Sequence, residues 1–133
     1  MSRERVELVR DGFEAWNSGD RQWVLDHMSP EIEWITPAED PEPGRYRGFE
    51  ELEGFWEQWR ATFGHLRFEI EDLIDARESV VVIARRSGTG ESSGVAISDR
   101  IVQVFSFDND DRCLRVQEFY DREAALDRAI ERD

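Results

Sequence analysis

The stretch Trp16-Asn17-Ser18-Gly19-Asp20 separates two predicted helices, and a strand over residues 32–37 follows them. Before this stretch, apolar residues recur at the spacing of one helix face: Val6, Val9, Phe13 and Trp16. Asn17 and Gly19 tolerate left-handed backbone and end the first helix, and Asp20 is placed to cap the next one. Two helices ahead of a sheet indicate a lid over a concave surface. The lid predicts a pocket.

Two more helical segments can be read on either side of a loop. Before Pro30, three apolar residues predict a short second helix: Trp23, Val24 and Met28. Residues 37–48 hold three Pro and two Gly and are predicted as a loop. A strongly amphipathic third helix follows and ends at Gly64, and its apolar residues are Phe49, Leu52, Phe55, Trp56, Trp59 and Phe63.

From Leu66 the apolar period changes to two, which predicts strands. A half-buried strand starts there, and the continuous apolar run over residues 80–84 fits a central strand. A flexible connection at 87–94 leads to a strand over 97–107, a turn, and a last strand over 113–120. Asp121 caps a closing helix with four apolar residues: Ala125, Leu126, Ala129 and Ile130. This order predicts an α+β fold with helices on one face of an antiparallel sheet.

The last hairpin predicts which residues face the core. If Asn109-Asp110 is a two-residue turn, Gln103 pairs with Val116, and Ile101 pairs with Glu118. Directly paired residues share a face, so one face holds Ile101, Gln103, Phe105, Leu114, Val116, Glu118 and Tyr120. We place this more apolar face against the helices, which leaves Gln103 and Glu118 as polar groups in the core. A turn one residue longer would reverse the assignment, because the period of a strand is two.

Composition excludes several classes of partner. The 133 residues are enough for one domain over residues 1–133 that needs no disulfide or metal. The net charge of −14 argues against nucleic acid, which is bound through clustered basic residues. No apolar run approaches the ~20 residues of a membrane span and no leader is seen, so we expect a cytoplasmic protein. One cysteine, and two histidines at element ends, predict no metal site, and we expect no cofactor.

Four segments keep a specific order along the chain: Trp16–Asp20, Ile32–Trp34, Arg47-Gly48 and Glu118–Leu126. Together they resemble the SnoaL-like branch of the nuclear-transport-factor-2-like superfamily, over essentially the whole chain. The resemblance implies a curved antiparallel sheet that forms a cone closed by N-terminal helices. The superfamily includes polyketide cyclases, ketosteroid isomerases, limonene epoxide hydrolases, dehydratases and non-catalytic binding modules. Function must therefore be read from the pocket.

The known catalytic sites of the superfamily are mostly missing from this chain. The positions of the isomerase base, its helix-one Tyr and its second oxyanion-hole acid hold Thr36, Gly12 and Gln103. The Arg and Asp that the epoxide hydrolases carry on the third strand correspond to Val80 and Val82. Glu118 matches the remaining carboxylate of those hydrolases. One carboxylate, one amide, one hydroxyl and an aromatic wall are what this chain retains.

We predict that Glu118 transfers a proton and that burial raises its pKa above the ~4.3 of a free Glu. The predicted substrate-binding residues are Trp16, Trp34, Thr36, Phe55, Trp59, Gln103 and Tyr120. Structural roles compete with these. Glu118 would instead pair with Arg86 or reach solvent, Gln103 would be a satisfied core amide, and the aromatic residues would be core packing.

Two functions stay open. One is a cofactor-independent isomerase, cyclase or lyase that acts on an apolar cyclic substrate through Glu118. The other is a non-catalytic ligand-binding or dimerisation domain. A cavity of ~300 Å³ or more with Glu118 on its wall favours the enzyme. A cavity filled by Trp16, Trp34 and Trp59 favours the binding domain.

The outward face of the last hairpin predicts a homodimer. Val102, Val104 and Phe119 are expected to form an apolar centre on this face, with a polar rim of Arg100, Arg115 and Gln117. An apolar centre with a polar rim is the usual composition of a protein interface. The resemblance implies the same, because relatives commonly dimerise through this convex face.

Overall fold

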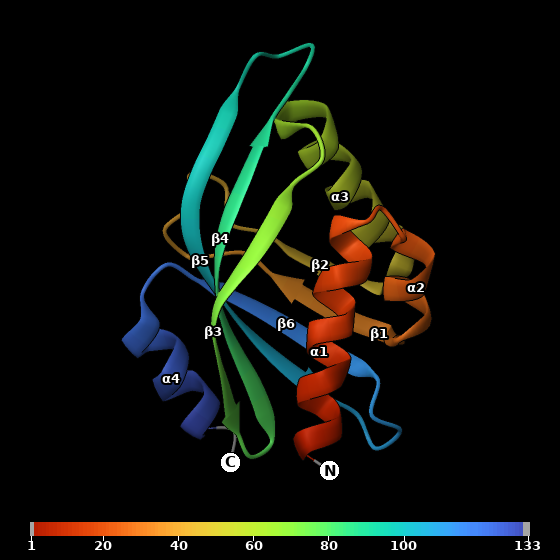
Figure 1. Cartoon of the computed structure of the whole chain (residues 1–133), viewed down its shortest axis with the longest axis vertical. Helices are drawn as coiled ribbons and strands as arrows, with labels where there is room; N and C mark the ends of the chain where they lie inside the picture. Colours follow the sequence, from red (N-terminus) through yellow and green to blue (C-terminus); the bar gives the residue numbers. More distant parts are fainter. Residues whose placement is uncertain (1, 132–133) are drawn as a thin grey trace.

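The computed structural model describes residues 2–131, and side-chain burial within residues 4–129. Its elements are α1 (Ser2–Asn17), α2 (Arg21–Asp26), β1 (Met28–Ile35), β2 (Arg45–Arg47), α3 (Gly48–Phe63), β3 (Arg67–Ala76), β4 (Ser79–Thr89), β5 (Ala96–Phe107), β6 (Cys113–Phe119) and α4 (Arg122–Glu131). The strands form a curved, unclosed six-stranded sheet in the order β2-β1-β6-β5-β4-β3 (Figure 1). This confirms the predicted α+β class with a curved sheet. Within the described residues, no helix is long and apolar enough to cross a membrane.

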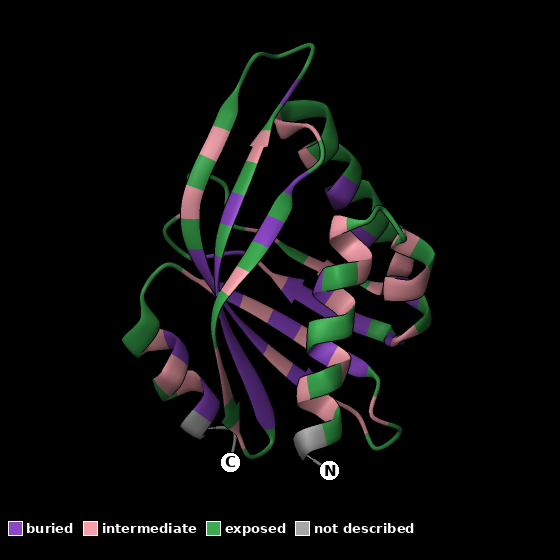
Figure 2. Cartoon of the chain, in the orientation of Figure 1, coloured by how far each residue is buried: buried purple, intermediate pink, exposed green. Residues whose placement is uncertain are grey.

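Helices cover both faces of the sheet. α1, α2 and α3 lie on the concave face, whereas α4 lies on the opposite, convex face (Figure 1). The small side chains of Ala125 and Ala129 let α4 pack closely against Val102 and Val104, in the buried region of the central strands (Figure 2). The prediction that all helices share one face is therefore wrong for α4. Ile130, which was predicted on the apolar side of this helix, lies outside the residues whose side chains are described.

The same packing corrects the predicted dimer surface. Val102 and Val104 are 1% and 2% exposed, because the α4 of the same chain covers them. Phe119 also packs against this cluster. The apolar centre that the sequence suggested for a second copy is thus part of the core of this chain.

Several element boundaries differ from the predictions. α2 ends at Asp26, and Met28 begins β1 instead of continuing the helix. Pro30 lies inside β1 where the pairing with β6 is interrupted, so its missing N–H breaks no regular ladder. The predicted loop at 37–48 contains the edge strand β2, which pairs with β1. β4 extends to Thr89, inside the predicted connection at 87–94, and β5 begins after it at Ala96.

The turn of the β5–β6 hairpin is longer than predicted. It spans residues 108–112, and the Asp108 N–H donates a hydrogen bond of 3.0 Å to the Arg112 carbonyl. Together with a register shift near the turn, this pairs Gln103 with Glu118, two positions from the predicted register. Because the displacement is an even number of residues, Gln103 and Glu118 keep the predicted face. Both are buried in the core.

Leu114 and Tyr120, which were predicted on the core face of the hairpin, lie elsewhere. Cys113 pairs with Phe107 and is buried, whereas Leu114 is the extra residue at the register shift and is half-buried. Tyr120 lies beyond the end of β6, is 40% exposed and donates a hydrogen bond to Asp40. The prediction of Tyr120 on the core face is wrong, because the strand has ended before it.

The C-terminus of α3 is fixed by its contact with the end of β4. Gly64 caps the helix at a φ of 72°, a left-handed conformation that favours glycine. A Cβ atom at this position would lie 2.3 Å from the Thr89 carbonyl oxygen. A close backbone approach therefore positions the helix that carries Trp56 and Trp59.

Replacing Gly64 should test this contact. Gly64→Ala is expected to destabilise the fold by about 2 kcal/mol or more, because it adds both backbone strain and a clash. Gly54→Ala in the same helix is the control, since its Cβ would meet open space. Alanine there should stabilise the fold by about 0.5–1 kcal/mol. Urea unfolding of the two variants measures both effects, and equal changes would contradict the assigned contact.

Candidate functional site

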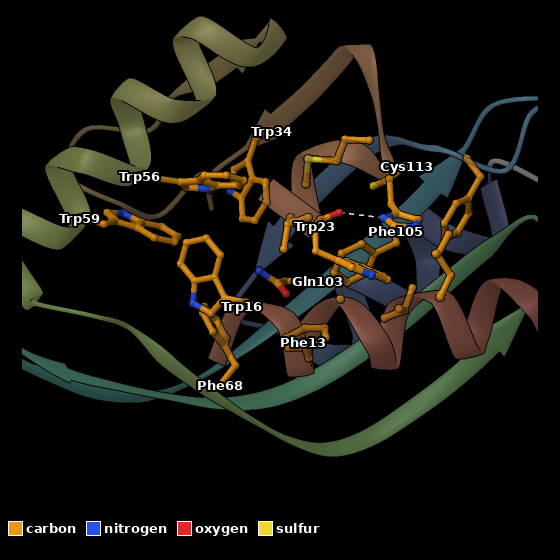
Figure 3. A pocket seen from close by; sticks show the side chains of 17 residues that line it. Phe13, Trp16, Trp23, Trp34, Trp56, Trp59, Phe68, Gln103, Phe105 and Cys113 are labelled. Carbon is orange, nitrogen blue, oxygen red and sulfur yellow. Dashed lines mark hydrogen bonds between the residues drawn. The ribbon is translucent and has the colours of Figure 1, made fainter. Parts of the chain in front are cut away.

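An inner cavity of about 80 Å³ lies between the concave face of the sheet and the helices (Figure 3). All five tryptophans of the chain line it: Trp16, Trp23, Trp34, Trp56 and Trp59. Further aromatic walls come from Phe13, Phe68, Phe105 and Phe107. The Gln103 side chain supplies an amide to this wall, from the middle of β5.

Hydrogen bonds hold the end of α1 against β3 and fix one side of the cavity. The Trp16 indole N–H donates to the Leu66 carbonyl at 2.7 Å. The Asn17 side chain donates to the Phe68 carbonyl at 2.7 Å and accepts from the Phe68 N–H at 2.9 Å, as a neighbouring strand would. Trp16 also packs edge-on against Trp56, with ring centroids 5.0 Å apart. These contacts therefore hold the Trp16 side of the aromatic wall against β3.

Glu118 lies behind the amide of Gln103 and is 1% exposed. The Gln103 Nε2 donates to the Glu118 Oε2 at 2.8 Å. The other oxygen, Oε1, is buried with no hydrogen-bond partner among the described residues. The Trp34 indole N–H faces this carboxylate but falls short of hydrogen-bond geometry. A buried carboxylate thus has one bound oxygen and one unbound oxygen.

Arg86 does not form the ion pair with Glu118 that the structural alternative required. Its guanidinium donates two hydrogen bonds to Asp99, at 3.0 and 2.9 Å. Burial raises the pKa of Glu118 to about 7, while the nearby charge of Arg86 and the hydrogen bond from Gln103 oppose the rise. Glu118 therefore changes its charge close to neutral pH, as a general acid–base must.

The predicted site residues divide into two groups. The inner cavity brings together Trp16, Trp34, Trp59 and Gln103. It does not include the other four, which are Thr36, Phe55, Glu118 and Tyr120.

Local contacts explain why these residues lie elsewhere. The Thr36 hydroxyl is engaged with Gly44, whose N–H it accepts at 2.6 Å, and so closes the loop before β2. The Phe55 ring is stacked on Tyr46 at 4.2 Å in the core. Glu118 is covered by its partner Gln103.

Sequence reasoning missed part of the aromatic wall. Trp23, Phe68 and Phe105 line the cavity but were not among the candidates. The helical spacing of Trp56 and Trp59 placed both residues on one apolar face, although only Trp59 was selected. The alternation of β5 also placed Phe105 beside Gln103, so the pattern did contain a usable signal.

Comparisons with known proteins place the chain among the SnoaL-like domains. The SnoaL-like family profile matches residues 9–116. A nuclear-transport-factor-2-like protein of unknown function from Burkholderia pseudomallei has a similar structure, with a TM-score of 0.76, 24% identity, and coverage of 95% of this chain and 96% of that chain. A protein from Jannaschia sp., provisionally described as a SnoaL-like polyketide cyclase, has a TM-score of 0.69 and 20% identity. That similarity covers 97% of this chain and 91% of that chain. TerC, crystallised with polyporic acid, has a TM-score of 0.74 and 20% identity, with coverage of 96% of this chain and 98% of that chain. The chain matches no curated protein.

The buried carboxyl group should make stability depend on pH. The pKa of Glu118 rises from 4.5 to about 7 on folding, so the folded state binds this proton more tightly than the unfolded chain. The resulting stabilisation is fully present below pH 4.5 and is lost as the pH rises through 7. Gln does not titrate, so the Glu118→Gln variant does not lose stability in this way. The free energy of unfolding of the variant minus that of the wild type should therefore increase by about 3 kcal/mol between acid and alkaline pH. Urea unfolding across that range measures it, and a difference independent of pH would contradict the assignment.

Proposed function

Because the chain belongs to the SnoaL-like domain family, we propose that it binds a small apolar ring compound in the inner cavity. The observation that carries this proposal is the presence of all five tryptophans around one cavity with the Gln103 amide. Aromatic walls favour apolar rings by burial and edge contacts, and one polar group fixes their orientation. Proteins with this fold include TerC, which was crystallised with polyporic acid.

The position of Glu118 favours binding over catalysis as the primary function. Glu118 is not on the wall of the inner cavity, and the cavity volume of about 80 Å³ is below the ~300 Å³ usual for small-molecule pockets. An apolar cavity of about 150 Å³ holds benzene in another protein, so a single ring enters the inner cavity only if the tryptophans move apart to enlarge it.

Proton transfer by Glu118 is a second candidate, favoured by its unbound Oε1 and its pKa of about 7. As carboxylate it would remove a proton from an acidic C–H, and as acid it would return the proton to carbon or to an oxygen leaving group. Gln103 lies between the cavity and this carboxylate, so its amide must rotate before a substrate reaches Glu118. The amide would then stabilise the developing charge on a carbonyl oxygen.

Cyclohexanone in deuterated water separates binding from proton transfer. Binding should quench tryptophan fluorescence in the wild type and in Glu118→Gln alike, because the cavity wall is unchanged. Exchange of the α-hydrogens for deuterium, followed by NMR, should be faster than in buffer with the wild type only. Equal exchange by both proteins would eliminate Glu118 as the base. Absence of quenching in both would contradict the binding function.

The homodimer and the cytoplasmic location inferred from the sequence remain predictions. With the apolar centre covered by α4, a dimer would have to form through another surface of the chain. Light scattering at micromolar concentration should then give twice 15.6 kDa. A mass that remains at 15.6 kDa would exclude the dimer.

A further inference from the structure

A second cavity lies on the outer side of the tryptophans. It has a volume of about 370 Å³ and is lined by the ends of α1 and α3 and by the first residue of α2. Trp16, Trp56 and Trp59 line both this outer cavity and the inner one. These three tryptophans therefore form a wall that the two cavities have in common.

We propose that the two cavities form one binding site for an elongated ligand that carries an apolar ring and a carboxylate. The ring occupies the inner cavity, and Arg21 and Arg60 bind the carboxylate in the outer cavity. This inference rests on the proposed binding function, and it adds the charge and the length of the ligand.

The charge of the outer cavity is the first argument. Within the described part of the chain, each ionisable side chain that lines it is basic: Arg21, Arg60 and His65. The whole chain has 31 acidic residues against 17 arginines, so a basic wall is unusual on this surface. A guanidinium group matches a carboxylate with two parallel N–H donors, which makes carboxylate the favoured anion.

The surrounding groups leave positive charge available. Arg21 and Arg60 share one carboxylate, that of Glu57, and the Arg21 contact is long at 3.6 Å. Both arginines are partly solvent-exposed, with 37% and 59% of their side chains accessible. The Arg21 guanidinium lies 5.8 Å from the ring centre of Trp56, which orients it beside the shared wall.

The helix ends at this cavity do not cancel that charge. α1 and α3 both end here, and helix C-termini carry partial negative charge. The carbonyls of Trp16 and Arg60 accept hydrogen bonds from the N–H groups of Gly19 and Gly64, at 3.0 and 2.9 Å. His65 donates its Nε2 hydrogen to the Asn17 carbonyl at 3.2 Å. These partners reduce the repulsion that an anion would meet.

Size is the second argument. Pockets for small molecules usually enclose about 300–1,000 Å³, and the inner cavity of about 80 Å³ is too small alone. The outer cavity of about 370 Å³ supplies the missing space. A ligand that spans both must be longer than one ring, and its polar end lies beside the arginines.

The pair biphenyl-4-carboxylate and biphenyl-4-carboxamide tests the inference, because the two compounds have nearly the same shape and differ in charge. Tryptophan fluorescence quenching at neutral pH gives both affinities for the full chain. The carboxylate should bind the wild type about tenfold more tightly than the carboxamide. In the double variant Arg21→Gln/Arg60→Gln the two affinities should become equal, while Arg21→Lys/Arg60→Lys should keep part of the preference.

The control double variant is Arg10→Gln/Arg112→Gln, which removes the same charge from two exposed positions that line neither cavity. It should keep the full preference for the carboxylate. Equal binding of the two compounds to the wild type, or a preference that survives Arg21→Gln/Arg60→Gln, overturns the inference. If cyclohexanone binds and neither biphenyl compound does, the shared site is wrong and the proposed binding function stands. If none of the three binds, both fail.

Discussion

The hydrogen bond between Gln103 and Glu118 is the interaction on which the interior of this protein depends. A carboxylate buried at 1% exposure is costly unless its oxygens are bound, and the amide of the neighbouring strand satisfies one of them. The same amide forms part of the wall of the inner cavity. Gln103 therefore contacts both the inner cavity and the carboxyl group of Glu118. A different register between β5 and β6 would separate them.

This interaction shows how much the sequence alone could predict. The alternation of β5 and β6 identified Gln103 and Glu118 as buried polar residues, although the predicted turn was too short. The error in the turn did not change the predicted faces of the two strands, because the observed pairing differs by two residues and an even displacement preserves the faces of a strand. Strand period is a local property, and the faces could therefore be read without knowing the turn.

Properties that depend on distant contacts could not be read in this way. The sequence of α4 shows an apolar stripe but not which face of the sheet it covers, and that choice buried Val102 and Val104. Thr36 was assigned from the positions of relatives, yet its hydroxyl is used by Gly44, eight residues later. The spacing of the tryptophans showed that they are buried but not that all five surround one space.

The parallel pairing of β1 with β6 has a consequence for the order of folding. Strands β3 to β6 are neighbours in both sequence and space, so they can pair through short connections. Met28 pairs with Cys113, about 85 residues away, and this contact closes a long loop at a high cost in chain entropy. We expect the β3–β6 meander to form first and the N-terminal half to dock onto it later. The aromatic interior would then be assembled in the last step, so changes within it should alter the rate of unfolding more than the rate of folding.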